Sequence, residues 1–181
     1  PNSLAPNTFI SIFGTELSFV TRGIEPGDIA GGQLPTSLLN TNVRVSVQGI
    51  LAHLLYVSPT QINALIPANL LPGPAEIGVF RNGVWGPLVK VELRPQAPAF
   101  FQADAATVVA TRADGSLITR EQRASTGEVV VLYCTGLGAT APPQSPGRLA
   151  TSAAQITQRD KLAVLLGGEL LPPQAVEYAG I

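Results

Sequence analysis

The sequence predicts an all-β protein built from β-sandwich modules, and three observations support this prediction. Short apolar runs recur along the chain between turn residues, and several of them alternate apolar and polar side chains. The 181 residues include 18 Gly and 16 Pro, which suits short strands and tight turns better than helices. A set of landmarks in the first half of the chain also returns, in the same order, in the second half.

Most of the predicted strands lie in the first half. Val43–Val47 and Gln61–Ile66 alternate apolar and polar residues, which indicates one buried face for each strand. Asn82-Gly83 separates two β-type runs and predicts a type I′ hairpin. The predicted strands are Thr8–Phe13, Val43–Val47, Leu51–Val57, Gln61–Ile66, Ala75–Phe80 and Val84–Glu92.

The second half begins after Pro95–Pro98, which interrupts the strand pattern and is predicted to be a linker. Thr107–Thr119 is predicted to be a hairpin that turns at Asp114-Gly115. Val129–Tyr133 is predicted to be a strand. Thr151–Asp160 leaves two alternatives open, a short capped helix and a loop.

The internal repeat sets the predicted domain organisation. Its landmarks are offset by roughly 115 to 122 residues, which indicates repeated modules. We therefore predict one sandwich module at residues 1–95, followed at residues 96–181 by the linker, the hairpin and a partial second module. The paired landmarks are Thr8–Leu17 with Glu128–Leu137, Leu34–Ser37 with Leu149–Ser152, Val43–Gly49 with Leu162–Gly168, and Leu54–Val57 with Ala175–Gly180.

The second module has no counterparts of the later strands of the first, so its apolar residues need cover. Three sources are predicted for Leu162–Leu166: the hairpin Thr107–Thr119, a neighbouring copy of the chain, or further residues of the natural chain.

Several strings resemble a known family. They are LLYVSPTQINALIP at Leu54–Pro67, NTFISIFGTELS at Asn7–Ser18, YCTGLGA at Tyr133–Ala139 and EYAG at Glu177–Gly180. Together they resemble the Solibacter-type uncharacterised C-terminal domain family, whose repeats are found at the ends of large predicted secreted proteins. The first module is also similar to the IPT/TIG group of immunoglobulin-like domains.

This resemblance implies tandem immunoglobulin-like (IPT/TIG-like) β-sandwich modules, the second one incomplete, in a secreted or cell-surface bacterial protein. It implies no activity, because the family has no established biochemical function. Cys134 departs from the pattern, since the corresponding position in the first module is Gly14.

Composition excludes several classes of function. The sequence has 11 Lys and Arg residues and 12 Asp and Glu residues. The charges nearly cancel, so no net field attracts nucleic acid or an acidic membrane surface. No apolar run approaches the roughly 18 residues needed to span a bilayer. The low charged fraction of 13% is typical of extracellular β-proteins, and a single cysteine forms no intrachain disulfide.

The predicted function is therefore a non-enzymatic structural or adhesive module, with the other domains of a parent protein as partners. The alternative is a carbohydrate-binding accessory module of an extracellular enzyme, and a protein ligand or self-association through the second module is also considered. Trp85 and Phe19 are the candidate surface residues for a carbohydrate or protein ligand, with packing as the alternative for each. Phe100-Phe101 is predicted to join the two modules.

No catalytic, cofactor or metal residue is predicted. Gly136–Ala141 matches GxGxxA, but Pro142 and Pro143 are incompatible with the helix that a dinucleotide site requires. His53 is the only histidine, and Cys134 is predicted to be a buried, unreactive thiol. Glu25 and Asp28 leave open whether they bind calcium or are solvated turn residues.

Overall fold

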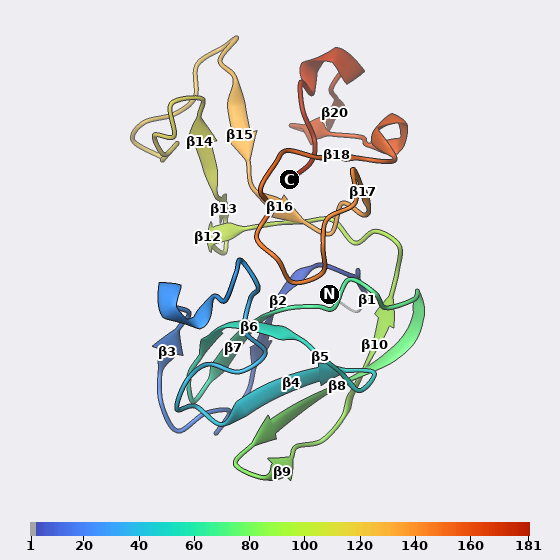
Figure 1. Ribbon diagram of the computed structural model, residues 1–181. Helices are drawn as coiled ribbons and strands as arrows, with labels where there is room; N and C mark the ends of the chain where they lie inside the picture. Colours follow the sequence, from blue (N-terminus) through green and yellow to red (C-terminus); the bar gives the residue numbers. More distant parts are fainter. Residues whose placement is uncertain (1–2) are drawn as a thin grey trace.

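The computed structural model describes residues 3–181 and consists of strands, turns and loops (Figure 1). The prediction of an all-β protein is confirmed. The helical content of these residues is three single 3-10 turns, η1 (Pro26–Asp28), η2 (Arg159–Lys161) and η3 (Pro173–Ala175). Within the described part of the chain, no helix is long and apolar enough to cross a membrane.

Residues 3–94 form two β-sheets. The first has the order β1-β10-β8-β4-β5, with β9 attached to β8, and the second has the order β2-β7-β6-β3. Every pairing in them is antiparallel except the parallel pair β1–β10. The first sheet contains β1 (Ser3–Leu4), β4 (Val43–Val47), β5 (Ile50–Leu51), β8 (Gly73–Arg81), β9 (Val84–Trp85) and β10 (Val89–Leu93), and the second contains β2 (Phe9–Phe13), β3 (Arg22–Gly23), β6 (His53–Val57) and β7 (Gln61–Leu65).

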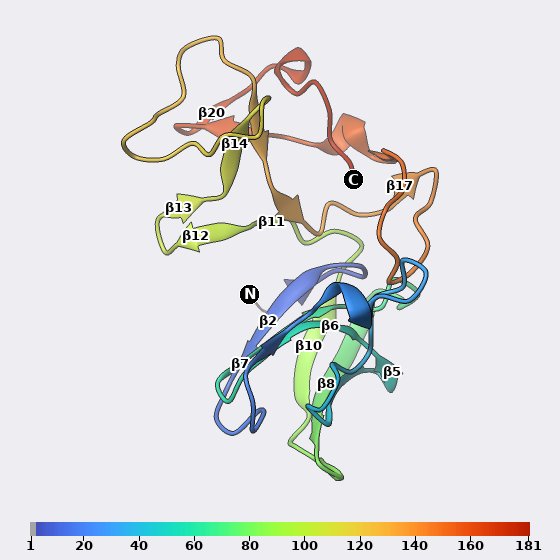
Figure 2. The ribbon, with the colours of Figure 1, turned by 60° about the vertical axis from the view of Figure 1, so that its left-hand side comes forward.

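The two sheets face each other and enclose one apolar core (Figure 2). Val43, Val45 and Val47 of β4 are fully buried, as the period of two predicted. Ile62 and Ala64 of β7 supply the opposing layer, and both are also fully buried. Burying each large aliphatic side chain contributes about 1.5–3 kcal/mol, so this core is the main source of stability in residues 3–94.

Residues 99–181 are organised differently, as five two-stranded pairings rather than two extended sheets (Figure 1). Fewer apolar side chains are buried here, and those that are come mainly from Ala110, Ala154, Ile156 and Ala179. The pairs are β11 (Ala99–Phe100) with β16 (Cys134–Thr135), β12 (Gln102–Asp104) with β13 (Thr107–Val108), β14 (Ala110–Arg112) with β15 (Val130–Leu132), β17 (Thr140–Ala141) with β18 (Gln155–Ile156), and β19 (Leu165–Leu166) with β20 (Glu169–Leu170).

The turn predictions are confirmed. Asn82 and Gly83 both have positive φ and connect β8 to β9 in a two-residue turn. At Asp114-Gly115 the N–H of Gly115 donates to Arg112 O at 3.0 Å, and the N–H of Arg112 donates to Ser116 O at 2.9 Å. Of the two alternatives for Thr151–Asp160, the loop is correct, since the segment contains only β18 and the start of η2.

The first repeat landmark is a strand in both places but has different partners. β2 pairs with β7, which follows it in the chain, whereas β15 pairs with β14, which precedes it. The predicted hairpin Thr107–Thr119 forms only in part: β13 pairs with β12, β14 pairs with β15, and the arm after the turn makes the isolated bridge Thr111–Leu117. Neither β13 nor β14 pairs with β19, whose strand partner within residues 3–181 is β20 alone.

Candidate functional site

An exposed aromatic surface lies on the outer face of the six-stranded sheet, and we call Arg44, Phe80, Trp85 and Leu88 the Trp85 surface. The strand register places Arg44 opposite Phe80 and Phe80 opposite Trp85. The Phe80 and Trp85 rings are 5.3 Å apart at 58°, and the Arg44 guanidinium carbon lies 5.8 Å from the centroid of the Phe80 ring. Trp85 is 49% exposed, so one side of its indole is open to a partner.

Gly78 explains how Trp85 reaches this position. A Cβ at Gly78 would lie 3.0 Å from Leu88 Cδ2 and 3.2 Å from Trp85 Cε3. The absence of a side chain therefore lets Trp85 and Leu88 pack down onto the middle of β8. Two tilted rings beside a guanidinium form an uneven surface rather than the flat aromatic platform that a sugar ring stacks on.

Phe19, the second predicted surface residue, does not join this surface. Its ring lies under the guanidinium of Arg81, 4.4 Å from the ring centroid. Arg81 and Phe80 are neighbours on β8, so their side chains leave opposite faces of the sheet. Phe19 is 67% exposed, but its ring is engaged by a cation of the same chain.

Glu25 and Asp28, the two possible calcium ligands in the sequence, both pair with Arg22. Asp28 accepts two hydrogen bonds from Arg22 Nη2, at 3.0 and 3.2 Å, and its side chain is 7% exposed. Glu25 Oε2 lies 3.3 Å from the same nitrogen, and the Glu25 N–H donates to Asp28 Oδ2. Arg22 thus already neutralises one of the two negative charges and occupies oxygens that a calcium ion would need, which disfavours calcium at this position.

The glycines of the GxGxxA string allow the linker to pass close to the backbone. A Cβ on Gly136 would lie 2.1 Å from Ala97 O, and a Cβ on Gly138 would lie 3.0 Å from Gln96 Cγ. The N–H of Ala97 also donates to Gly136 O at 2.9 Å. The two glycines therefore allow the linker to run against β16, and Pro142–Pro146 is a loop, as predicted.

Two loops join the halves of the molecule through backbone hydrogen bonds, and we call Gly31–Leu34 with Gly147–Leu149 the junction. The N–H of Leu34 donates to Gly147 O at 2.8 Å, and the N–H of Leu149 donates to Gly32 O at 2.9 Å. Gln33 lies opposite Arg148 in an antiparallel bridge. Leu34 and Leu149 begin the same repeat landmark, so corresponding residues meet in a nearly two-fold arrangement.

Side chains reinforce the junction. Arg148 donates to Gly31 O, and Gln33 Nε2 donates to Gly147 O at 3.0 Å. His53 Nδ1 hydrogen-bonds Leu34 O at 2.8 Å, and a Cβ on Gly147 would lie only 1.9 Å from His53 Nε2. The one histidine is therefore a half-buried contact residue of the junction, a role that its place in a strand did not reveal.

A second contact joins the halves beside the junction. The rings of Phe9 and Phe101 are 5.8 Å apart, and the N–H of Phe9 donates to Thr135 Oγ1 at 3.0 Å. The prediction that Phe100-Phe101 joins the modules is thus confirmed for Phe101. Phe100 is 50% exposed and contributes its backbone to the pairing with Cys134.

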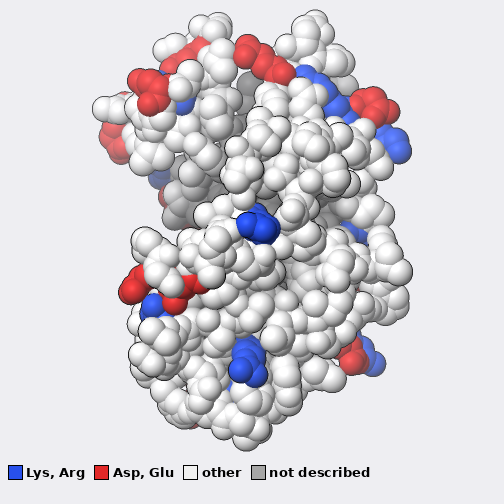
Figure 3. Space-filling view, viewed as in Figure 1, with Lys and Arg blue, Asp and Glu red and all other residues white. Residues whose placement is uncertain are grey.

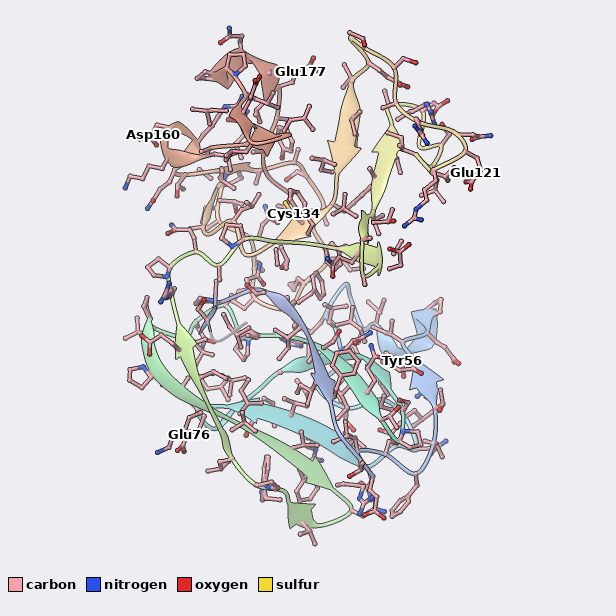
Figure 4. All side chains as sticks on the ribbon, turned by 180° about the vertical axis from the view of Figure 1, so that it is seen from behind. Tyr56, Glu76, Glu121, Cys134, Asp160 and Glu177 are labelled. Atoms are coloured by element: carbon pink, nitrogen blue, oxygen red, sulfur yellow. The ribbon has the colours of Figure 1, made fainter. Side chains whose placement is uncertain are left out.

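Cys134 lies in the middle of the C-terminal half and is half-buried rather than buried, which corrects the prediction (Figure 4). It lies in a two-residue strand with one partner strand, so no second layer seals it. Desolvation raises the pKa of its thiol, which keeps the sulfur protonated at neutral pH. The thiol is therefore a poor nucleophile.

A groove of about 410 Å³ lies between the halves, bordered by the linker and the loop after β17. Its polar side chains are amides and hydroxyls, among them Asn7, Gln96, Gln144 and Gln158, and no acidic, basic or cysteine side chain lines it. Such a lining supplies no side-chain general base, and without one its threonine hydroxyls are weak nucleophiles. Residues 3–181 also contain no cluster of three or more His, Cys, Asp or Glu side chains that could hold a metal ion.

Charge is sparse over the visible surface. Figure 3 shows one face on which Lys, Arg, Asp and Glu form small separate groups between wide uncharged areas. This distribution agrees with the 13% charged residues of the sequence and creates no single-sign field on that face.

Comparisons with known proteins give no relative: no family model, no curated protein and no solved structure matches the chain. The resemblance to the Solibacter-type and IPT/TIG families therefore remains a prediction from the strings quoted above.

Proposed function

We propose that this chain is a non-enzymatic structural segment of a larger secreted or cell-surface bacterial protein, in which it holds neighbouring domains at a fixed distance. The junction supports this proposal most strongly. Backbone hydrogen bonds join residues more than a hundred positions apart, so the halves are held by defined geometry rather than by a flexible tether. The secreted setting and the immunoglobulin-like character of the modules come from the resemblance to the Solibacter-type and IPT/TIG families.

Three separate contacts restrict the angle between the halves. They are the junction, the Phe9–Phe101 pair with its Thr135 hydrogen bond, and the passage of the linker over Gly136. Each net hydrogen bond contributes about 0.5–1.5 kcal/mol, so no single bond fixes the angle. Contacts at three places along the interface resist bending in more than one direction, and a spacer needs this property.

Substitution of Gly147 tests the proposal. Gly147→Ala places a Cβ against the His53 ring at a φ of 64°, whereas Gly167→Ala has a φ of 62° and open space around it. Both variants carry the same left-handed backbone cost of about 1 kcal/mol, so the difference between them reports the junction.

We expect Gly147→Ala to broaden the distribution of distances between spin labels on the two halves, and Gly167→Ala to leave it narrow. Double electron–electron resonance measures both. A broad distribution in the unsubstituted protein would contradict the spacer proposal.

A carbohydrate-binding accessory module is the second candidate, and one observation favours it: the Trp85 indole is 49% exposed and offers a single ring to a sugar, although its 58° tilt against Phe80 provides no flat two-ring platform. If this candidate is correct, a panel of soluble oligosaccharides should include a ligand whose affinity falls at least about tenfold in Trp85→Ala. Phe19→Ala is the matched control, because Phe19 is exposed but lies on the other face of β8. Binding that Trp85→Ala leaves unchanged would exclude the Trp85 surface.

A further inference from the structure

Two hairpins of this chain share one geometry. The hairpin β4–β5 turns through Gln48-Gly49, and β19–β20 turns through Gly167-Gly168; all four turn residues have positive φ. After each turn the same backbone hydrogen bond forms. The N–H of Ala52 donates to Val45 O at 2.9 Å, and the N–H of Leu171 donates to Val164 O at 2.8 Å. The second hairpin is therefore a structural counterpart of the first, residue for residue.

The two hairpins differ in their neighbours. β8 pairs with the free side of β4 along all five residues, with Val47 opposite Ile77 and Ser46 opposite Gly78. β19 has no such neighbour within residues 3–181. The consequence is exposure: Val47 is 0% exposed, whereas its counterpart Leu166 is 71% exposed and Leu165 is 63% exposed.

The backbone of β19 shows which groups are free to bind. Val164 O is directed toward β20, as its bond to Leu171 shows, so the N–H and C=O of Leu165 are directed to the opposite edge. In the first hairpin the corresponding edge is used, since the Gln48 N–H donates to Glu76 O of β8 at 2.9 Å. The counterpart of Gln48 is Gly167, whose N–H faces the same open edge.

We propose that the open edge of β19 binds an extended segment of another polypeptide as an added antiparallel strand, in the register that β8 adopts on β4. The bound strand carries apolar side chains opposite Val164 and Leu166, as β8 carries Val79 and Ile77 opposite Val45 and Val47. A small residue fits opposite Leu165, because Gly78 occupies that place in β8 and Leu165 is bulkier than Ser46. Backbone bonds supply affinity and the alternating side chains supply specificity.

A peptide copied from the chain itself is the probe. A synthetic peptide with the sequence of Gly73–Arg81 is added to the intact protein, and amide hydrogen exchange is followed by NMR. We expect exchange at Leu165 and Gly167 to slow at least about tenfold at saturating peptide, and exchange in β4 to stay unchanged because its edge is occupied. A peptide with proline in place of the Gly78 residue, whose N–H would face β19 in this register, should give no protection.

The protein variant Leu165→Pro removes only the N–H that faces the open edge, so the β19–β20 pairing is retained. We expect it to abolish peptide binding, and Leu165→Thr, which keeps the N–H, to bind as the unsubstituted protein does. Unchanged exchange at Leu165 and Gly167 with peptide, or equal binding by Leu165→Pro, would overturn the proposal. Protection that appears without peptide and increases with protein concentration would also overturn it, since a second copy would then occupy the edge.

Discussion

The two halves of the molecule use similar local sequences and reach different degrees of burial. In residues 3–94 the strand β4 lies between β5 and β8 and faces a second sheet, so Val43, Val45 and Val47 are fully buried. In the C-terminal half the hairpin β19–β20 has the same turn and register but leaves Leu165, Leu166 and Leu170 exposed. Local sequence thus determines the hairpin, whereas the strands that pack on it determine what it contributes to stability.

The two halves also differ in how much their stability depends on the contact between them. The C-terminal half has a small core of its own, and it is held against the N-terminal sandwich by glycines that permit close approach. We therefore expect substitutions at these glycines to have larger effects than substitutions of exposed leucines in the same half.

The largest effect is expected for Gly136→Ala. The new Cβ would lie 2.1 Å from Ala97 O, so the linker must move, and the residue must also adopt a φ of 75°. We expect a loss of about 3 kcal/mol from the free energy of unfolding of the C-terminal half.

The control is Gly127→Ala, with a φ of 81° and no atom near the added Cβ, and an expected loss of about 1 kcal/mol. Urea titration followed by circular dichroism measures both variants. Equal losses would show that the linker contact does not matter.

The matched variants Val47→Ala and Leu166→Ala measure directly how much a buried and an exposed hairpin side chain each contribute to stability. Val47 is fully buried, so its truncation should cost about 2 kcal/mol. Leu166 is 71% exposed, and its truncation should cost less than about 0.5 kcal/mol. Both values come from urea titration, and a cost for Leu166→Ala as large as that for Val47→Ala would mean that β19 is covered in solution.

Arg22→Met tests the ion pair near η1 in the N-terminal half. It leaves Asp28, whose side chain is 7% exposed, without the guanidinium nitrogen that donates to both of its oxygens, and we expect a loss of about 1.5 kcal/mol. Calcium should leave the melting temperature of the unsubstituted protein unchanged, because the Arg22 guanidinium already pairs with both carboxylates and leaves the group a single net negative charge. A rise in melting temperature at millimolar calcium would contradict this account.

The smallest effect concerns the rate of labelling of Cys134. Burial raises the pKa of this thiol, so at any pH below that value it holds less thiolate than a free cysteine does. We expect labelling by a thiol reagent to be slow at pH 7 and to accelerate as pH rises through and beyond the usual range of cysteine pKa values. Labelling at pH 7 as fast as in urea-unfolded protein would contradict the assigned environment.

Much of the N-terminal half could be predicted from sequence, because its signals are local. The alternation in Val43–Val47 and the turn residues Asn82-Gly83 each act within a few positions, and the structure has a strand and a turn there. The turn at Asp114-Gly115 was equally local.

The parts that the sequence did not predict depend on contacts between distant residues. His53 and Gly147 are far apart in the chain, and nothing near either residue indicates that they touch. The GxGxxA string shows the same difficulty, because its glycines contact a linker that lies some forty residues earlier in the chain. Trp85 was predicted as a surface residue from its place after a turn, but its packing over Gly78 depends on how β9 folds back.

Amide hydrogen exchange over the whole chain, in the protein alone, tests the central claim that the junction holds two unequal halves together. We expect the amides of Leu34 and Leu149 to exchange slowly, because each donates a backbone hydrogen bond across the junction, and the amides of Leu165 and Gly167 to exchange fast, because they face an open edge. If Leu34 and Leu149 exchange as fast as Leu165, the halves move independently and the chain is not a rigid spacer.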